Sequence, residues 1–424
     1  MSARKNAFVF QPKIQPPLLP THRQDRCASH AAVLPNEVLL HLFKRLTDPK
    51  DRASCRHVCR AWYEVMNDHT LWVGRTVCLK RLLSVPRYCW DLLKRRRPSR
   101  IQVRLSAKTP RQLQLAFEQL RRLIVEDIPH VTSLHLLVSS NIDLTGLSVA
   151  MTMFRRLQTL AFTNLSSHSK ALIGLETALD HAVSLTELEI AGFRIPDLSS
   201  ASHPDLVVLK LSLREAISPS QLSALLKQLP HLKHLELSTA NASVDGKSIR
   251  KRIRSTHPWF LADDEDGAGD EQGAAKPSHV KSLEALARLV AGQHSLTHLD
   301  LSGTQCSDEV LQALATTSCP LRSLELGMCA HVTMEGLRYL SNMASSDLTH
   351  LGLSHCARVE QEGVALLPTM FPSLASLDLS GWSLSSKTLS KLYQRTQLRT
   401  LVLRGVNPSI LQDSLHTRRC SIIT

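Results

Sequence analysis

One short pattern, Leu-x-x-Leu-x-Leu, constrains the fold of this chain more than any other feature of its sequence. It begins at Leu157, Leu185, Leu206, Leu232, Leu296, Leu321, Leu348, Leu374 and Leu398, with Ile or Phe also occurring at the sixth position. A weaker copy begins at Val131, and residues 101–105 resemble a degenerate first copy. The steps between successive fourth-position leucines are 26, 28, 21, 26, 64, 25, 27, 26 and 24 residues. This near-constant period predicts a stack of similar units.

Each copy predicts a short strand followed by a helix. Positions four and six lie on one side of the strand because strand side chains alternate. Helical spacing follows several copies, as at Val310, Leu311 and Leu314. One unit cannot bury its apolar side alone, so the units must stack. We therefore expect an α/β fold in which residues 131–424 form a leucine-rich-repeat solenoid. This horseshoe would carry parallel strands on its concave face and helices outside.

Two units, those beginning at Leu321 and Leu348, resemble the cysteine-containing subtype of leucine-rich repeat. Cys329 and Cys356 lie three positions after the last leucine of these units. The resemblance implies that they line the interior, where a free cysteine behaves as a small hydrophobic residue. No base is spaced to activate either thiol, so we prefer this interpretation to a catalytic one.

The single 64-residue step contains a normal period plus an insertion at about residues 240–279. Its sequence is first basic (247–254), then carries Trp259 and Phe260, and then becomes acidic and glycine-rich. This composition predicts a disordered loop. A tolerated insertion is the simpler interpretation, and a regulatory or nuclear-targeting segment is the alternative.

Positive charge is concentrated near the N-terminus. Residues 1–100 carry a net charge of +13, and the remaining residues carry +1. A basic nucleic-acid-binding surface is therefore not expected on the large C-terminal part. We expect residues 1–33, which are rich in Pro and Gln, to be a disordered tail, and 78–130 to be a basic linker with the first degenerate repeat. Contact of 78–130 with nucleic acid or membrane is a weaker alternative.

Several further sequence features indicate where in the cell the protein is expected. The run Lys94–Arg97 resembles a nuclear localisation signal, although it could equally be a solvated helix end. The first twenty residues lack a signal-peptide pattern, and no apolar run has the length of a membrane helix. The cysteines are scattered without a C-x-x-C pair. We expect a cytoplasmic or nuclear protein with reduced thiols and no membrane contact.

Residues 34–77 predict a compact helical module. Leu34-Pro35 opens a first helix, Asp48-Pro49 caps a second, and residues 58–66 carry the apolar stripe of a third. The stripe of the first helix consists of Val38, Leu39, Leu42, Phe43 and Leu46. About 44 residues are too few to bury so many large apolar side chains without help. We therefore expect another protein to cover part of this module.

The same stretch resembles an F-box. Its matching features are Leu34-Pro35, acidic Glu37, the apolar first helix, the run Val58 to Trp62, and Leu71-Trp72. The resemblance implies docking of a Skp adaptor, which would bring a cullin scaffold and a RING subunit. The residues then expected to bind the adaptor are Leu34, Pro35, Val38, Leu39, Leu42, Phe43, Leu46, Val58, Cys59, Trp62, Leu71 and Trp72.

An F-box followed by leucine-rich repeats resembles the substrate receptors of SCF-type ubiquitin ligases. No phosphate-binding loop, zinc-site spacing or nucleophile motif occurs in the sequence. We therefore expect a non-catalytic subunit without cofactor or metal. An adaptor that binds the Skp protein and a target without ubiquitination is the alternative.

The expected substrate surface is the concave strand face. Position five of successive repeats reads His135, Ala161, Glu189, Lys210, Glu236, Asp300, Glu325, Gly352, Asp378 and Val402. Five of these ten residues are acidic and one is basic, whereas a purely structural face would gain from mixed charges. We expect it to bind a basic segment of a protein, more tightly at neutral than at mildly acidic pH because histidines lie beside it. A solvated polar face is the simpler alternative. The candidate residues are Glu187, Glu189, His234, Glu236, His298, Asp300, Glu325, His350 and Asp378.

Overall fold

The computed structural model describes the greater part of the repeats and of the helical module. The described residues are 7–10, 34–46, 49–79, 82–85, 87–105, 109–138, 142–165, 172–182, 184–193, 205–213, 225–239, 295–304, 306–316, 319–342, 347–393, 397–405 and 421–423. The chain divides into two compact units, residues 1–185 with 245–270 and residues 186–244 with 271–424. The predicted insertion at 240–279 lies outside the described residues.

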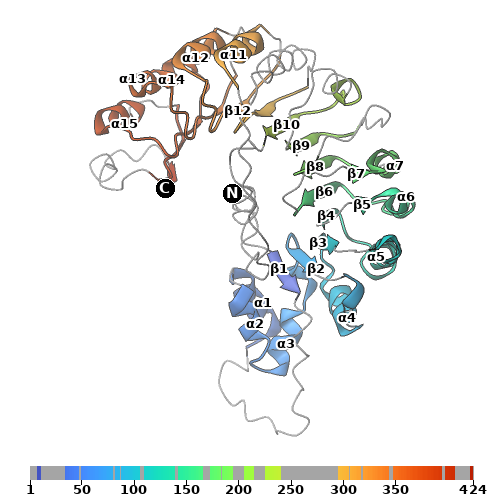
Figure 1. Cartoon of the computed structure of the whole chain (residues 1–424). Coiled ribbons are helices and arrows are strands. Elements are labelled where there is room, and N and C mark those ends of the chain that lie inside the picture. Colours follow the sequence, from blue (N-terminus) through green and yellow to red (C-terminus); the bar gives the residue numbers. More distant parts are fainter. Residues whose placement is uncertain are drawn as a thin grey trace, which may run out of the picture. The chain divides into compact units, whose positions relative to one another are not determined.

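The first unit contains the helical module that the apolar stripes predict (Figure 1). It consists of α1 (Asn36–Arg45), α2 (Pro49–Cys55), α3 (Arg60–Met66) and the 3-10 turn η3 (His69–Leu71). Pro35 precedes the first turn of α1, where a missing N–H has no cost. The core includes Leu39, Met66 and Trp72, each at most 1% exposed. The predicted three-helix arrangement is confirmed.

A parallel sheet follows in the same unit, with its helices on one side (Figure 1). The strands of this sheet are β1 (Ala7–Phe10), β2 (Thr76–Leu79), β3 (Arg100–Leu105), β4 (Ser133–Val138) and β6 (Thr159–Asn164). The helices are η4 (Leu82–Ser84), α4 (Arg87–Arg96), α5 (Pro110–Arg122), the π-helical turn η5 (Leu123–Asp127), α6 (Thr145–Met151) and α7 (Leu175–Asp180). A separate two-stranded pair joins β5 (Ile142–Asp143) to β7 (Leu172–Ile173).

Two domain assignments from the sequence need correction here. The described residues of 78–130 are not a linker, because they form strands and helices of the stack. The first degenerate repeat expected in this range is β3, which pairs between β2 and β4. Within the tail expected to be disordered, residues 7–10 form β1 and pair with β2. The other residues of that tail lie outside the described part of the chain.

The second unit continues the same strand-and-helix repeat. Its strands are β8 (Glu187–Ala191), β9 (Val208–Leu213), β10 (His234–Thr239), β11 (His298–Asp300), β12 (Ser323–Glu325), β13 (His350–Gly352), β14 (Ser376–Asp378), β15 (Thr400–Val402) and β16 (Ser421–Ile423). Its helices are α11 (Asp308–Ala315), α12 (Met334–Ser341), α13 (Gln361–Val364), α14 (Leu367–Met370) and α15 (Ser386–Tyr393). These helices lie on one side of their strands (Figure 1).

The leucines of the repeat set the register of both units. Leu235 of β10 pairs with Leu299 of β11, and Leu299 with Leu324 of β12, so fourth-position leucines lie side by side. The neighbouring position-four and position-six residues are buried, as Leu351 and Leu353 illustrate with no exposed surface. The predicted solenoid of parallel strands is confirmed. Because β10 pairs directly with β11, the insertion separates two adjacent rungs of one sheet.

A second ladder runs through the interior at position nine of the repeat. The Cys329 thiol donates to the carbonyl of Leu301 at 3.3 Å, and the Cys356 thiol to the carbonyl of Leu326 at 3.1 Å. In the next repeat, the Trp382 indole N–H donates to the carbonyl of Leu353 at 2.6 Å. Burial raises the pKa of Cys356 to about 12, which keeps this thiol protonated. The prediction that Cys329 and Cys356 line the interior is confirmed.

None of the helices in the described ranges is long and apolar enough to span a membrane.

Candidate partner-binding surfaces

The helical module exposes a row of aliphatic side chains along α1. Leu34, Val38 and Leu42 are 37%, 42% and 46% exposed, and Val58 is 54% exposed. Val38 and Leu42 are one helical turn apart and share a face of α1, and Leu34 lies just before the start of this helix. Pro35 is also exposed. We call Leu34, Pro35, Val38, Leu42 and Val58 the apolar stripe.

Four other residues predicted to bind the adaptor lie elsewhere. Leu39, Phe43, Leu71 and Trp72 are at most 3% exposed, so they form the core of the module instead of its surface. The spacing of apolar residues in the sequence could not distinguish core residues from interface residues, because an apolar side chain suits both. Leu39 and Phe43 follow the helical period of α1 on its inner side.

The remaining predicted residues, Leu46, Cys59 and Trp62, are half-buried. The Trp62 ring packs edge-on against Phe43, with ring centroids 5.0 Å apart. Its indole N–H is buried and finds no hydrogen-bond acceptor among the described residues. Trp62 is therefore a half-buried residue that packs on the core of the module, and its indole N–H has no acceptor among the described residues.

Arg52, which the sequence patterns did not single out, holds the module together. It is 2% exposed, and its guanidinium donates to the carbonyls of Phe43 (2.9 Å), Leu46 (2.7 Å) and Leu71 (3.3 Å). Helix ends leave carbonyls without partners, and this side chain supplies donors to two such ends. Burial, together with the charge of Arg75, lowers the pKa of Arg52 to about 10, so it stays charged at neutral pH.

The polybasic run Lys94–Arg97 includes a buried member. Arg96, at the end of α4, has no exposed surface and donates twice to Asn67 Oδ1, at 3.1 and 2.8 Å. Its guanidinium also stacks on the Trp72 ring at 3.9 Å from the centroid. One of the four charges needed for a nuclear localisation signal thus connects α4 to the helical module. Arg96 is therefore not a solvated charge, and a nuclear signal at this run stays a hypothesis.

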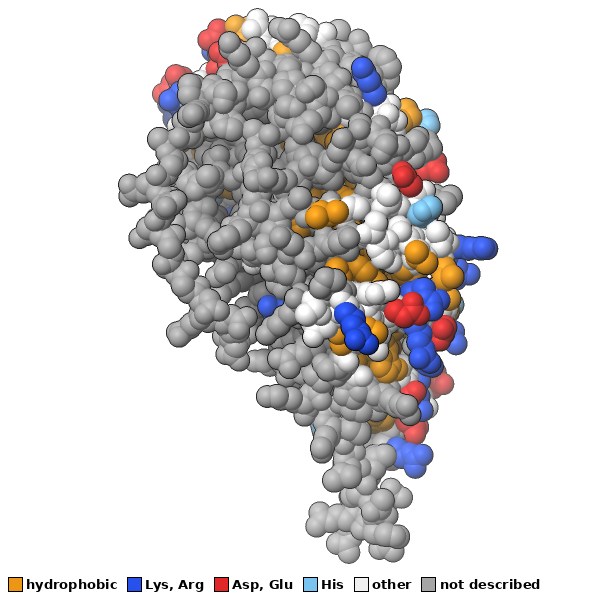
Figure 2. Space-filling model, turned by 45° about the vertical axis from the view of Figure 1, so that its right-hand side comes forward, with side chains coloured by type: hydrophobic (Ala, Val, Ile, Leu, Met, Phe, Trp, Pro, Cys, Tyr) orange, Lys and Arg blue, Asp and Glu red, His pale blue; other side chains and the backbone are white. Residues whose placement is uncertain are grey.

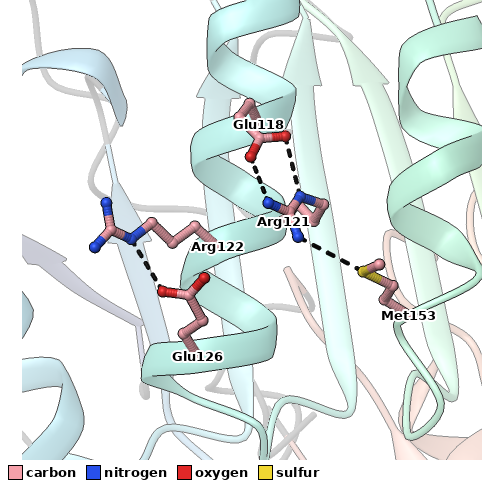
Figure 3. Close-up of polar contacts among 5 residues, drawn as sticks. All are labelled: Glu118, Arg121, Arg122, Glu126 and Met153. Carbon is pink, nitrogen blue, oxygen red and sulfur yellow. Dashed lines mark hydrogen bonds and ion pairs between the residues drawn. The ribbon is translucent and has the colours of Figure 1, made fainter.

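Basic residues on α5 are largely paired within the helix (Figure 3). Arg121 bonds the Glu118 carboxylate, and Arg122 bonds Glu126 at 3.0 Å. Figure 2 shows basic and acidic side chains interspersed on the helix side, where α5 and its neighbours lie. These pairs involve only Arg121 and Arg122, and residues 78–130 remain strongly basic, so their contact with nucleic acid or membrane stays a hypothesis.

The strand face of the second unit follows the predicted register. We define this face as positions three, five and seven of the repeats from β8 to β14, on the side opposite the leucines. Glu189 pairs with Lys210, Lys210 with Glu236, Glu236 with Asp300, and Asp300 with Glu325. Asp378 is two rungs further, beyond Gly352. The predicted column is therefore one continuous row.

Negatively charged side chains greatly outnumber positively charged ones on the strand face. Its carboxylates are Glu187, Glu189, Glu236, Asp300, Glu325 and Asp378, and Lys210 is the one lysine or arginine at these positions. Lys210 Nζ pairs with Glu187 at 2.7 Å. Burial raises the pKa of Glu189, although the Lys210 charge works in the opposite direction. One ammonium cannot offset so many carboxylates, so the strand face is acidic at neutral pH.

The histidines on this face occupy two different environments. His234 and His298 stack with nearly parallel rings 5.4 Å apart. Burial, then Lys210 and His298, lower the pKa of His234. His350 bonds Glu325 at 2.5 Å, and this bond raises the pKa of His350 against the effect of burial. Gly352 lies beside Glu325, and a Cβ there would collide with that carboxylate.

The strand face of the first unit is different, because its polar side chains bond one another. The Cys78 thiol donates to Gln102 at 2.8 Å, Gln102 contacts His135 at 3.3 Å, and His135 contacts Thr163 at 2.8 Å. The predicted acidic column is thus a feature of the second unit alone. Within the described part of the chain, no three His, Cys, Asp or Glu side chains are grouped as metal ligands.

Comparisons with known proteins agree with this architecture. The F-box-like family model matches residues 31–79, and a leucine-rich-repeat family model matches residues 292–315. No curated protein matches the chain.

Two solved structures are similar over most of the chain. One is Rad7 from a yeast complex with Elc1, at 12% identity and a TM-score of 0.49, covering 92% of each chain. The other is the internalin InlF of Listeria monocytogenes, at 13% identity and a TM-score of 0.39, covering 92% of this chain and 93% of that one. Likenesses this distant carry no conclusion about function. The two family matches, on a helical module and a repeat stack that the structure describes, support membership of the F-box/leucine-rich-repeat family.

Proposed function

We propose that this chain is the substrate-recognition subunit of an SCF-type ubiquitin ligase. The F-box module binds a Skp-type adaptor, which connects it to a cullin scaffold and a RING subunit. The observation that carries the proposal is the apolar stripe, exposed on a module that matches F-box-like proteins. Several large aliphatic side chains exposed on so small a module, two of them on one face of α1, are typical of an interaction site.

Target proteins bind the strand face of the second unit through a basic segment. The support for this step is the excess of carboxylates along β8 to β14. Complementary charge speeds encounter and selects partners. The subunit is non-catalytic and acts by proximity, because it holds the target near the ubiquitin carrier. It works in the cytoplasm or the nucleus.

Co-purification tests the docking step. Val38→Asp/Leu42→Asp places two charges on exposed positions, so the module stays folded while the adaptor surface is lost. The control is Val149→Asp, which changes an exposed aliphatic residue on α6 (63% exposed). We expect wild type and control to retain the Skp adaptor and the cullin, and the double variant to lose both. Retention of the adaptor by the double variant would contradict the proposal.

The strand face is tested by charge reversal. Asp300→Lys/Glu325→Lys should abolish capture of the target and preserve adaptor binding. Asp347→Lys/Glu362→Lys makes the same charge change at exposed carboxylates of the same unit outside the strand face, and it should preserve both. Equal loss of the target in the two variants would mean that net charge, not this surface, selects it.

An adaptor without ligase activity is distinguished by two readouts. It would bind the Skp protein without the cullin, and its removal would leave target abundance unchanged. The proposed receptor retains the cullin, and its removal raises target abundance.

A further inference from the structure

Two neighbouring strands of the strand face, β10 and β11, bring three kinds of polar side chain together. His234 and His298 pair at position three of the repeat, and Glu236 and Asp300 pair at position five. At position seven, Ser238 lies on the same side of β10, because strand side chains alternate. An imidazole pair, a carboxylate pair and a hydroxyl therefore follow one another along these strands. We call these five residues the β10–β11 patch.

The hydroxyl of Ser238 distinguishes this patch from the rest of the strand face. Ser238 is 5% exposed, and its Oγ is buried without a hydrogen-bond partner among the described residues. Leaving a buried hydroxyl unpaired costs free energy, and most such groups in folded proteins are bonded. A ligand group that reaches Ser238 would supply the missing bond.

Exposure falls along the patch from position three to position seven. His298 is exposed, Glu236 and Asp300 are half-buried, and Ser238 is buried. A long side chain that lies along these strands would therefore pass the imidazoles first. Its tip would end between the carboxylates, beside the hydroxyl.

The two carboxylates suit a bound cation. Asp300 Oδ1 accepts the backbone N–H of Ser302 at 2.8 Å, which orients this carboxylate. Lys210, on the other side of Glu236, bonds Glu187 at 2.7 Å. Carboxylates on adjacent strands, ~4.8 Å apart, repel each other. A cation placed between Glu236 and Asp300 would relieve that repulsion.

The imidazoles can accept a cation beside them. The rings of His234 and His298 are nearly parallel, with centroids 5.4 Å apart. Burial, followed by the charges of Lys210 and His298, lowers the pKa of His234. The His234 ring is therefore neutral at neutral pH and does not repel a positive charge.

We propose that the β10–β11 patch binds an arginine of the target protein. The inference rests on the proposed function, in which the strand face binds a basic segment, and it names the residue that is selected. A planar guanidinium has several N–H donors, so it can bond both carboxylates and the Ser238 hydroxyl together. Its flat face can also stack on an imidazole. A lysine ammonium is a compact, strongly hydrated charge that lacks this geometry.

Binding of defined peptides to the full chain tests this specificity. The probes are short basic peptides in which each basic position in turn is arginine, lysine or citrulline, which resembles arginine without its charge. Wild type should prefer both basic residues to citrulline. At one position it should bind arginine about tenfold more tightly than lysine, the effect of one hydrogen bond to a charged group.

Ser238→Ala removes only the hydroxyl of the patch. This variant should lose the preference for arginine over lysine and keep the preference for basic residues over citrulline. Its melting temperature should not fall, because the hydroxyl has no partner to lose in the free chain. The control is Ser354→Ala, which makes the same change at position seven of the repeat that contains β13 and should keep both preferences.

The possible failures separate this inference from the proposed function. No preference for basic residues over citrulline would contradict binding of a basic segment, and the arginine site with it. Equal binding of arginine and lysine at every position would overturn the arginine site alone. An arginine preference that survives Ser238→Ala, or a lower melting temperature of that variant, would also overturn it.

Discussion

Arg52 is the side chain on which the F-box module most depends. Its guanidinium donates to three backbone carbonyls, two at the end of α1 and one at the end of η3. Arg52→Ala removes these three bonds, and among the described residues only the Phe43 carbonyl keeps another donor, the Leu46 N–H, so the loss costs about 3 kcal/mol of stability. Thermal unfolding should show the loss, and adaptor binding should weaken because the apolar stripe loses its support.

Arg60→Ala is the matched control for that change. Arg60 is exposed and pairs only with Glu64 one turn away, at 3.1 Å. An exposed pair of this kind contributes at most about 0.5 kcal/mol. If Arg60→Ala destabilised the module as much as Arg52→Ala, the role assigned to the buried guanidinium would be wrong.

The Glu325–His350 pair gives the second unit a pH dependence. The hydrogen bond to Glu325 raises the pKa of His350. A raised folded-state pKa stabilises the fold fully below the unfolded value, and this contribution disappears as pH rises through the folded value. Glu325→Gln should therefore lower stability near about pH 5.5 by a fraction of a kcal/mol, since both groups are about one-third exposed. Near about pH 8.5, where His350 is neutral, this destabilisation of the variant should be absent.

The same pair bears on target binding. Protonated His350 neutralises Glu325, so capture of a basic segment should weaken as pH falls below neutral. The pKa of His234 is lowered instead of raised, so this imidazole becomes protonated only at lower pH. An imidazole NMR titration that found an unshifted His350, or one that titrates below its ordinary value, would contradict this account.

Among the elements, strands are the part that the sequence specified best. The leucines at positions four and six fix register as well as burial, which is why Glu236, Asp300 and Glu325 were correctly predicted to be neighbours. The α1 stripe was predicted less well, because burial of Leu39 and exposure of Val38 depend on which side α3 packs.

Some elements carried no recognisable signal. At position nine, Trp382 occurs where the two preceding repeats have cysteine. Its hydrogen bond shows that it is equivalent to them, because Trp382 and Cys356 both donate to the carbonyl of the last leucine in the preceding repeat. β1 lacks the repeat pattern and depends on a long-range pairing. The hydrogen bonds of Arg52 and Arg96 likewise join segments far apart in sequence. Local periodicity cannot encode such contacts.

The insertion between β10 and β11 should be dispensable for folding. Leu235 and Leu299 pair directly on either side of it. Deleting about residues 242–278 should therefore leave the melting temperature nearly unchanged, because loop length affects stability only weakly. A large fall in melting temperature would mean that the segment packs as structure. Retained adaptor binding in the same variant would show that the first unit is unaffected.

At the scale of the whole molecule, the chain separates two recognition tasks. The exposed aliphatic side chains of the proposed docking surface lie on the helical module, whereas the acidic strand face belongs to the second unit. The first unit's strand face satisfies its own polar groups through Cys78, Gln102 and His135. Changes to one surface should therefore leave the other surface's partner bound.

The affinity of the purified chain for a purified Skp-type adaptor tests the central claim most directly. Isothermal titration should give tight binding by wild type and by Asp300→Lys/Glu325→Lys. Val38→Asp/Leu42→Asp should bind at least about a hundredfold more weakly, since truncating central interface anchors costs ~2 kcal/mol or more each. No binding by wild type, or equal binding by the α1 variant with its fold intact, would contradict the account.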